Sequence, residues 1–358
     1  MRITQLQIKN FRCFESLNLT LDAPLILIEG LNGAGKTSLL EAMHFLCYLR
    51  SFRTHMPQEL VQFGRDHFFI KAHLQDTATC DIYDLQVGFT NKKRLVKINN
   101  KTVGLFKELL HYYRAVTLTE DDLGLIKEGP DSRRLFIDQC ILLINPDFAA
   151  LMKKSRDIVL NRNALLKKGG STDSYDVWTE QLWHVSSLVQ TFRIEMLFQL
   201  EKEIQLLIAD YFDSEFTITL SYLPKKSLLN SIDEFRTSHN YLYQEEQRFG
   251  RSLFGSQLDD FSIQFKNITS KNFASRGQQK LIILLLKVAQ IKLLQAQHKS
   301  VVFLLDDFMT DFDQRRIKTL ILLLTEIKIQ LILTVPTWDS PLQNELKASK
   351  TTFSKLTI

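Results

Sequence analysis

The sequence is poor in the residues that mark secreted, metal-binding and membrane proteins. Its 358 residues include four cysteines, at positions 13, 47, 80 and 140, and no two of them form a C-x-x-C pair. This spacing indicates neither a zinc site nor a disulfide framework. No apolar run is long enough to cross a bilayer, because even the run from Leu281 is interrupted by Lys287. The first residues alternate like a strand and lack the apolar core of a signal peptide, so we expect a cytoplasmic protein without a membrane partner.

The sequence also has only a small net charge and no repeated segments. The 45 basic and 40 acidic residues leave a net charge of +5, which is too weak by itself to indicate nucleic-acid binding. The sequence contains no internal repeat and no low-complexity tract. Its length allows two or three structural units, each with its own core.

Hydrophobic patterns predict an α/β protein with a helical insertion. Strand-like alternation or short apolar runs occupy residues 3–8, 17–21, 25–28, 68–74, 82–89 and 95–98, and strands return at 301–305 and 329–333. Helical spacing covers 147–168 and 177–211, which predicts an antiparallel helical hairpin. An α/β core that is opened by this insertion and closed by the C-terminal strands fits the order of the elements.

One segment carries a phosphate-binding motif, G-x-x-x-x-G-K-T, between an apolar strand and a helical pattern. It consists of Gly30, Leu31, Asn32, Gly33, Ala34, Gly35, Lys36 and Thr37. In this context the glycines let backbone N–H groups face a phosphate, and the helix N-terminus adds partial positive charge. Lys36 would reach the β- and γ-phosphates of a nucleotide and Thr37 would hold Mg²⁺.

A second motif follows the apolar strand 301–305. Asp306 and Asp307 come directly after it, where a carboxylate can complete a Mg²⁺ site beside the phosphate-binding loop. We assign Asp306 to the metal and Asp307 to the activation of an attacking water. The alternative is an acidic pair that merely ends a strand.

A third motif, with Ser275, Gly277 and Gln278, precedes the helix that begins near Leu281. A serine hydroxyl, a glycine backbone and a helix N-terminus together form a second anion site. Two such sites on opposite faces are explained by a head-to-tail dimer, in which this loop covers the γ-phosphate bound by the partner. The alternative is a helix N-cap followed by a surface helix.

These three motifs, in this order, resemble the ABC-type head of the SMC-like DNA repair ATPases, and within them the RecF family. The resemblance extends over residues 8–14, 32–42, 50–54, 120–130, 133–138, 273–279 and 304–307. It implies a P-loop ATPase head, a mixed sheet around a central helix, with a mostly helical second lobe inserted. Residues 1–118 and 298–358 would form the ATP-binding lobe, and 119–297 the helical lobe with the third motif and the hairpin.

The resemblance also implies roles. Gly30–Thr37 and, in trans, Ser275, Gly277 and Gln278 would bind ATP, Thr37 and Asp306 would bind Mg²⁺, and Lys36 and Asp307 would act in a weak, DNA-stimulated hydrolysis. Residues 310–313 would communicate across an ATP-dependent homodimer. The family acts in DNA replication, recombination and the SOS response, with mediators of the RecO and RecR type that help to load recombinase at single-strand gaps.

Four positions depart from the related patterns. Arg276 stands where glutamine is common, and we expect it to face solvent; Glu120 replaces a frequent proline. Thr334 lies where transporter ATPases have a histidine, and Asp307 is shorter than the usual glutamate, which predicts slow turnover.

DNA contacts are harder to place from sequence. Arg50 and Arg53, with Phe52 and His55, form one basic and aromatic cluster, and further cations occur in the insertion at Lys153, Lys154, Arg156, Arg162, Lys167 and Lys168. They either contact phosphates or cover an exposed helix face. Because no base-reading motif is present, binding to duplex, gapped or single-stranded DNA should be independent of sequence. His44, Trp178 and Trp183 are expected in the core.

Two other functions remain open. A P-loop GTPase or kinase is disfavoured because Asn91-Lys92-Lys93-Arg94 lacks the aspartate of the guanine-specifying motif, and because neither class explains the third motif. The ATPase subunit of an ABC transporter is the closer alternative, and the missing histidine argues against it.

Overall fold

The computed structural model describes residues 1–358 except 78, 91–92, 105, 169–171, 213–215, 229–230, 239–240, 267, 271–273, 309–311, 336–340 and 349–351. The chain forms two compact units. The first unit contains residues 1–123 and 275–358, and the second unit contains residues 124–274. The predicted insertion is therefore present, and each unit is described by itself.

The first unit contains an antiparallel sheet with the strand order β2-β1-β4-β5-β6-β7. Its strands are β1 (Arg2–Phe11), β2 (Phe14–Thr20), β4 (His67–Gln75), β5 (Ile82–Thr90), β6 (Lys93–Ile98) and β7 (Lys101–Thr102). Ile3, Leu6 and Ile8 of β1 are buried, whereas Gln5 and Lys9 are exposed. This alternation confirms the strand pattern that the sequence predicted, with one side of the sheet facing the core.

A second, parallel sheet forms the centre of the first unit. Its order is β14-β3-β13-β12-β8, and it joins segments far apart in the sequence. The strands are β3 (Leu25–Glu29), β8 (Ala115–Leu118), β12 (Val302–Leu305), β13 (Gln330–Val335) and β14 (Ser354–Thr357). All residues of β3, β8, β12 and β13 are buried, as expected of a parallel sheet covered on both faces.

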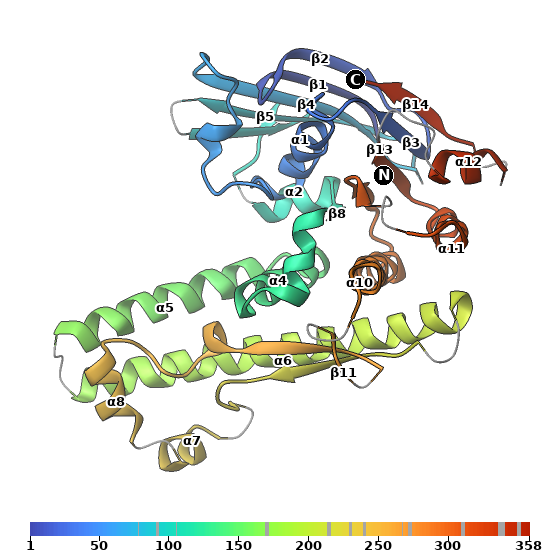
Figure 1. Ribbon diagram of the computed structural model, residues 1–358. Coiled ribbons are helices and arrows are strands. Elements are labelled where there is room, and N and C mark those ends of the chain that lie inside the picture. The colour runs from blue at the N-terminus through green and yellow to red at the C-terminus, as the bar shows by residue number, and fades with distance from the viewer. Residues whose placement is uncertain are drawn as a thin grey trace. The chain divides into compact units, whose positions relative to one another are not determined.

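Helix α1 (Lys36–Tyr48) lies between the two sheets and packs against β1 and β5 on one side and β8 and β12 on the other (Figure 1). The prediction of a mixed sheet arrangement around a central helix is confirmed. The other helical segments of this unit are η1 (Pro57–Leu60), α2 (Phe106–Tyr112), η2 (Glu120–Leu123), α10 (Arg276–Ala296), α11 (Gln314–Glu326) and α12 (Pro341–Ala348).

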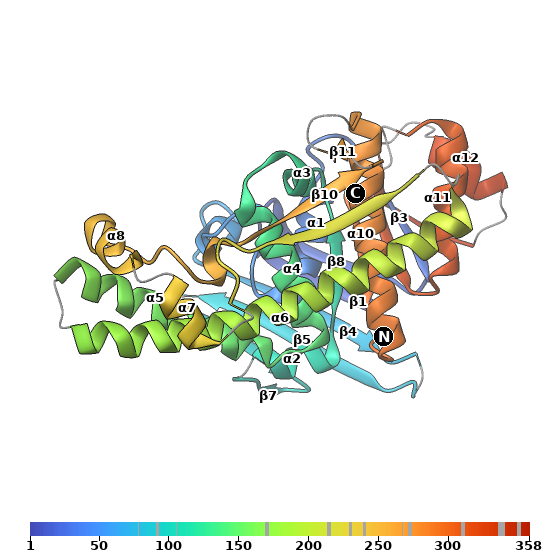
Figure 2. The ribbon, with the colours of Figure 1, turned by 90° about the horizontal axis from the view of Figure 1, so that it is seen from below.

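The second unit is built on the predicted helical hairpin. Helices α5 (Phe148–Lys168) and α6 (Thr172–Tyr211) pack against each other, and Figure 2 shows them side by side. Helix α6 begins five residues before the predicted start. The remaining elements are α3 (Gly124–Lys127), α4 (Pro130–Ile144), β9 (Ile218–Leu223), α7 (Ile232–Ser238), α8 (Leu242–Phe249), η3 (Ser256–Leu258), β10 (Asp260–Phe265) and β11 (Ile268–Thr269).

Helix α10 groups with the first unit, although the sequence assigned residues 119–297 to the helical lobe. The boundaries between the two units lie between residues 123 and 124 and between residues 274 and 275. The physical reason is that α10 packs against β8 and η2 and buries an apolar stretch that includes Leu281 and Ile291. The functional division into an ATP-binding lobe and a lobe with the third motif stays a prediction.

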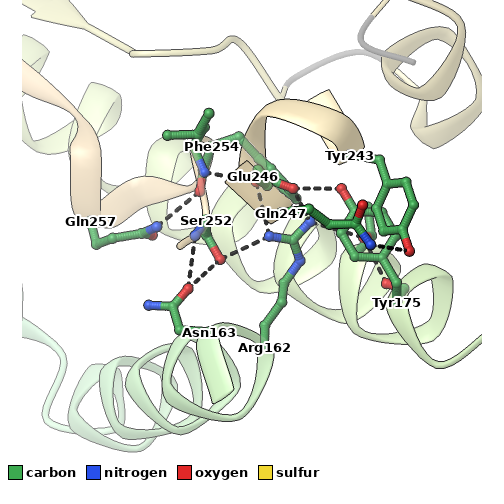
Figure 3. Close-up of polar contacts among 11 residues, drawn as sticks. Arg162, Asn163, Tyr175, Tyr243, Glu246, Gln247, Ser252, Phe254 and Gln257 are labelled. Atoms are coloured by element: carbon green, nitrogen blue, oxygen red, sulfur yellow. Dashed lines mark hydrogen bonds and ion pairs between the residues drawn. The ribbon is translucent and has the colours of Figure 1, made fainter. Parts of the chain in front are cut away.

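A buried arginine connects α5 to α8 in the second unit. Arg162 of α5 is fully buried and forms an ion pair with Glu246 of α8, with Nη1···Oε1 and Nη2···Oε2 distances of 2.9 and 2.6 Å (Figure 3). Its guanidinium also donates to Ser252 and Thr179, and it lies 4.6 Å from the ring centre of Tyr175. The expectation that Arg162 contacts DNA or covers an exposed face is therefore wrong, because a residue without exposed surface cannot reach a phosphate.

The apolar cluster around this ion pair contains the predicted core aromatics. It includes Ile158, Leu182, Val185 and Phe254, and both Trp178 and Trp183 pack against it half-buried. The tryptophans are therefore core residues, as the sequence predicted.

His44 of α1 is also a core residue, as expected. It is 6% exposed, its Nδ1 lies 2.8 Å from the Thr117 hydroxyl, and its ring stacks on Tyr48. Burial, with a smaller contribution from the Lys287 ammonium, lowers the pKa of His44 to about 3. The folded protein therefore holds this imidazole neutral.

This environment makes the stability of the first unit depend on pH. The pKa of His44 in the folded state lies below the unfolded value of about 6.5. The contribution of the neutral imidazole to the free energy of unfolding is therefore complete above pH 6.5 and is lost as pH falls from 6.5 towards 3. Between pH 7.5 and 4.5, the free energy of unfolding of the wild type should fall by up to about 2.5 kcal/mol more than that of His44→Gln. The glutamine keeps a polar partner for Thr117. Urea unfolding at both pH values measures this difference. Equal losses would show that His44 titrates normally.

Candidate nucleotide site

The phosphate-binding loop connects β3 to α1 with a backbone that requires glycine. Gly33 and Gly35 have φ values of 87° and 104°, in the left-handed region. A Cβ at Gly35 would lie 2.7 Å from Cys13 Sγ and from Phe14 Cζ, so a side chain is excluded by space as well as by φ. Gly35 is also the N-cap of α1 and offers no side-chain oxygen to the first N–H groups of the helix. These N–H groups can therefore donate to an anion.

The Lys36 ammonium is held over this loop. The side chain is 5% exposed, and Nζ donates to the carbonyl oxygens of Gly30 at 2.9 Å and Leu31 at 3.4 Å. Nζ also lies 3.7 Å from Asp307 Oδ2. The loop thus places a cation beside the N-terminus of α1, where a phosphate would meet both.

Thr37 and Asp306 come together as the sequence predicted. Thr37 Oγ1 donates to Asp306 Oδ2 at 2.7 Å, which joins the start of α1 to the end of β12. Burial raises the pKa of Asp306, and the hydrogen bonds from Thr37 and Thr334 oppose that shift. A hydroxyl and a carboxylate are the hard oxygen ligands that Mg²⁺ prefers.

The chemistry of these donors suits Mg²⁺ held together with a nucleotide. In the part of the chain that the structure describes, no group of three or more His, Cys, Asp or Glu residues could hold a metal alone. Mg²⁺ usually keeps water and substrate phosphate oxygens among its ligands, so two protein oxygens are sufficient.

Thr334 has a role that the sequence analysis missed. It follows Leu333 of β13, which pairs with Leu305, and it therefore lies beside Asp306. Its hydroxyl lies 2.9 Å from Asp306 Oδ1 and 3.3 Å from Asp307 Oδ1, and it accepts from the Asp307 N–H at 2.8 Å. The hydroxyl orients both carboxylates. The parallel pairing of the two apolar strands was the signal that could have shown this.

Asp307 differs from Asp306 in its backbone conformation and in its exposure. Its φ is 43°, which is uncommon for a residue other than glycine, and its side chain is 35% exposed. The two adjacent carboxylates thus differ in environment: Asp306 is buried against Thr37, whereas Asp307 faces Lys36 and is accessible to water.

The third motif forms the N-terminus of α10. Ser275 Oγ accepts from the Gln278 N–H at 3.3 Å, and Gln278 Oε1 accepts from the Ser275 N–H at 2.8 Å, a reciprocal capping box. The N-cap interpretation therefore holds for this chain. The surface helix of that alternative is wrong, because α10 is mostly buried. Ser275 is exposed and Gly277 half-buried, and contact with a partner's nucleotide stays a prediction.

Two of the departures from the family pattern interact. Arg276 Nη2 donates to Glu120 Oε2 at 3.2 Å, so Arg276 is exposed but also paired. Glu120 also forms an ion pair with Lys280, which is fully buried. Lys280 Nζ in turn donates to the Phe308 carbonyl at 3.3 Å, one residue beyond Asp307. The start of α10 is thereby connected to the loop that carries the acidic pair.

The segment 310–313 is described only in part, because residues 310 and 311 lie outside the described residues. Asp313 is the N-cap of α11, and its Oδ1 accepts from the Arg316 N–H at 2.8 Å. This observation does not test a role in communication across a dimer.

The basic cluster after α1 is held by a buried carboxylate. Glu41, fully buried, accepts from Arg12 at 2.8 Å and from Ser51, and it lies 3.8 Å from Arg53 Nη1. Arg50 is exposed and, with Arg94, lines a cavity of about 280 Å³. Phe52 packs edge-on against His44. Of the cations that the sequence analysis named in the insertion, Lys153, Lys154, Arg156, Lys167 and Lys168 are exposed.

A glycine-rich loop with the phosphate-binding pattern, a Thr–Asp pair at the end of a buried strand and two sheets around α1 define the fold class of P-loop ATPase heads of the ABC type. Consistent with this, the family model described as RecF/RecN/SMC N terminal domain matches residues 2–353. The chain belongs to this family, and within it to the RecF family, as the motifs predicted.

The relatives cover most of this chain. The DNA replication and repair protein RecF of Halothermothrix orenii is 31% identical over 331 residues, which cover 88% of this chain and 87% of the relative. The protein of the same name from Natranaerobius thermophilus is 28% identical over 351 residues, which cover 93% and 91%.

Solved structures agree with this placement. The recombination mediator protein RecF with ATP, described as part of the RecFOR pathway, has a TM-score of 0.82 and 25% identity over 94% of this chain and 93% of that one. An Smc head bound to the winged-helix domain of ScpA has a TM-score of 0.55 at 14% identity over 96% and 91%, which shows the shared fold alone.

Proposed function

We propose that the protein is an ATP-dependent DNA-binding protein of recombinational repair and replication restart, which acts in the cytoplasm. The observation that carries the proposal is the 2.7 Å hydrogen bond between Thr37 and Asp306, because it joins the phosphate-binding loop to the acidic strand end. The RecF relatives are named for DNA replication and repair, and a solved relative is a recombination mediator with ATP. These names favour repair over an ABC transporter. No helix in the described parts of the chain is long and apolar enough to cross a membrane.

ATP binding would use the groups that already converge at the loop. The N–H groups at the start of α1 and the Lys36 ammonium would bind the β- and γ-phosphates. Thr37 and Asp306 would hold Mg²⁺, which neutralises charge on the phosphates. Asp307, accessible to water and oriented by Thr334, would position the attacking water. Its short side chain favours slow hydrolysis, stimulated weakly by DNA.

The third motif would complete the site of a second copy. Ser275 is exposed, and its hydroxyl can turn from the Gln278 N–H to a γ-phosphate, while Gly277 allows close approach. ATP would then stabilise a head-to-tail dimer on duplex or gapped DNA. Phosphate contacts from exposed lysine and arginine side chains would make the affinity for DNA independent of sequence and weaker in high salt. Mediators of the RecO and RecR type would bind this dimer and help to load recombinase.

Ser275→Arg separates nucleotide capture from pairing. The variant should bind ATP with unchanged affinity but lose the ATP-dependent dimer, because a large cation replaces the hydroxyl that approaches the partner's γ-phosphate. Light scattering with ATP and gapped DNA measures the dimer, and fluorescent nucleotide titration measures capture. The control is Ser231→Arg, another exposed N-cap serine, whose Oγ accepts from the Glu234 N–H at 3.2 Å. A Ser275→Arg protein that dimerises like the control would remove the role in trans.

A further inference from the structure

A second group of cations lies at the opposite ends of the strands that form the nucleotide site. Arg114 directly precedes β8, and Ser300 lies two residues before β12, whereas Asp306 follows the other end of β12. Arg114, His111, Tyr112, His298, Lys299 and Ser300 line a cavity of about 250 Å³. Figure 2 shows the end of α10 beside residue 1, which lines the same cavity. Strand β12, which is about 13 Å long, lies between the two sites.

The cavity has an excess of positive charge. Asp76 is the only carboxylate among its lining residues, all of which the structure describes, against one arginine and one lysine. Arg114 is 7% exposed, so its guanidinium is largely removed from water. Burial, with a smaller contribution from the neighbouring Arg114 charge, lowers the pKa of Lys299. An anion bound in the cavity would be attracted by both cations.

Backbone hydrogen bonds fix the main chain that carries these cations. The Val302 N–H donates to the Arg114 carbonyl at 2.9 Å, which fixes Arg114 at the start of the paired strands. Helix α10 ends in a Schellman motif: the Lys299 N–H donates to the Leu294 carbonyl at 3.0 Å and the His298 N–H to the Gln295 carbonyl at 2.8 Å. These bonds occupy two of the carbonyls in the last turn of α10 and reduce the repulsion that an anion would meet there.

His298 occupies a position in this motif where glycine is the usual residue. Its φ is 54°, in the left-handed region. A glycine would adopt this conformation at lower cost, so the imidazole is placed at the cavity despite an unfavourable backbone.

We propose that this cavity is a phosphate-binding site, distinct from the loop at Gly30–Thr37. A guanidinium, an ammonium and hydroxyl donors match a phosphate, which offers several acceptor oxygens and carries about two negative charges as the free ion and about one in a nucleic-acid backbone. The volume is below that of pockets for drug-sized ligands and accommodates one phosphate group rather than a complete nucleotide. The phosphate comes either from the free ion or from the backbone of a nucleic-acid strand.

Titration with inorganic phosphate tests the free ion. Chloride balances the ionic strength, and a Lys36→Met background removes the amine of the nucleotide loop. We expect a saturable rise in Tm and broadening of the phosphorus NMR signal. Lys299→Gln should weaken phosphate binding about tenfold or more, because a charge-assisted contact is lost. His298→Gly should also weaken it, with Tm in chloride unchanged or higher. Lys318→Gln, an exposed lysine of α11, is the matched control.

Gapped duplex DNA, titrated into the same proteins without the Lys36 change, tests the second source. If phosphate has no effect but Lys299→Gln lowers DNA affinity well below that of Lys318→Gln, the cavity takes backbone phosphate. If Lys299→Gln and Lys318→Gln behave alike with both phosphate and DNA, the proposal is overturned. Both probes are compared between variants whose changes lie outside the nucleotide loop. A negative result for this cavity would therefore not contradict the proposed ATP site.

Discussion

Arg162→Met should destabilise the second unit by about 3–5 kcal/mol, because it leaves the Glu246 carboxylate buried without its cation. Glu246 is also fully buried, and its remaining polar partners are the Tyr175 hydroxyl and the Leu253 N–H. Neither partner carries a charge that could replace the guanidinium. Methionine has a similar length, so packing loss contributes less than the orphaned charge.

Urea unfolding followed by tryptophan fluorescence measures this change, because Trp178 and Trp183 pack against the same cluster. Arg156→Met is the matched control, since Arg156 is an exposed arginine on the same helix and its replacement should cost little. Adding Glu246→Gln to Arg162→Met should recover much of the loss. ATP binding should be retained, because the loop at Gly30–Thr37 lies in the other unit. A loss in Arg162→Met no greater than that of the control would contradict the importance of the ion pair.

Lys36→Met should reduce ATP affinity about a hundredfold or more. The ammonium supplies charge-assisted contacts to the β- and γ-phosphates, each of which contributes roughly 1.5–3 kcal/mol. Methionine fills the same space but leaves the carbonyls of Gly30 and Leu31 without the donor that they have now. The ATP-dependent dimer should disappear with the nucleotide.

Isothermal titration with ATP and Mg²⁺ measures this affinity, and light scattering with gapped DNA measures association. Lys318→Met removes a lysine of the same unit far from the loop in sequence and should behave as wild type. Circular dichroism establishes that the Lys36 variant is folded. A folded Lys36→Met protein that binds ATP as tightly as Lys318→Met would show that the loop does not bind the nucleotide.

The sequence predicted the parts of the site whose chemistry is local. The loop at Gly30–Thr37 could be found because its glycines and its lysine are adjacent, and Asp306 because an apolar strand ends there. Thr334 was missed as a partner of both aspartates because its role depends on the pairing of β13 with β12. When two strands are both apolar, the sequence alone does not reveal their register, and so does not reveal which residues lie side by side.

Charged residues were predicted least well, for a related reason. Arg162 has the sequence context of an exposed helix cation, and only the fold brings Glu246, 84 residues later, against it. Arg276 and Glu120 were each treated as separate departures from a pattern, yet they are paired across 156 residues. Pairing across such separations cannot be obtained from helical periodicity, which reports only the face that a residue occupies.

The order β14-β3-β13-β12-β8 also bears on synthesis at the ribosome. Strand β3 emerges from the ribosome early, but its neighbours β13 and β14 are among the last segments synthesised. The side chain of Gln330, in β13, also forms hydrogen bonds with the backbone of Ile3 and Leu21. Contacts between such distant segments form slowly because a long loop must close first. The nascent chain therefore carries a glycine-rich loop without its acidic partner until nearly the whole polypeptide has emerged, so premature capture of a nucleotide by an incomplete chain is disfavoured.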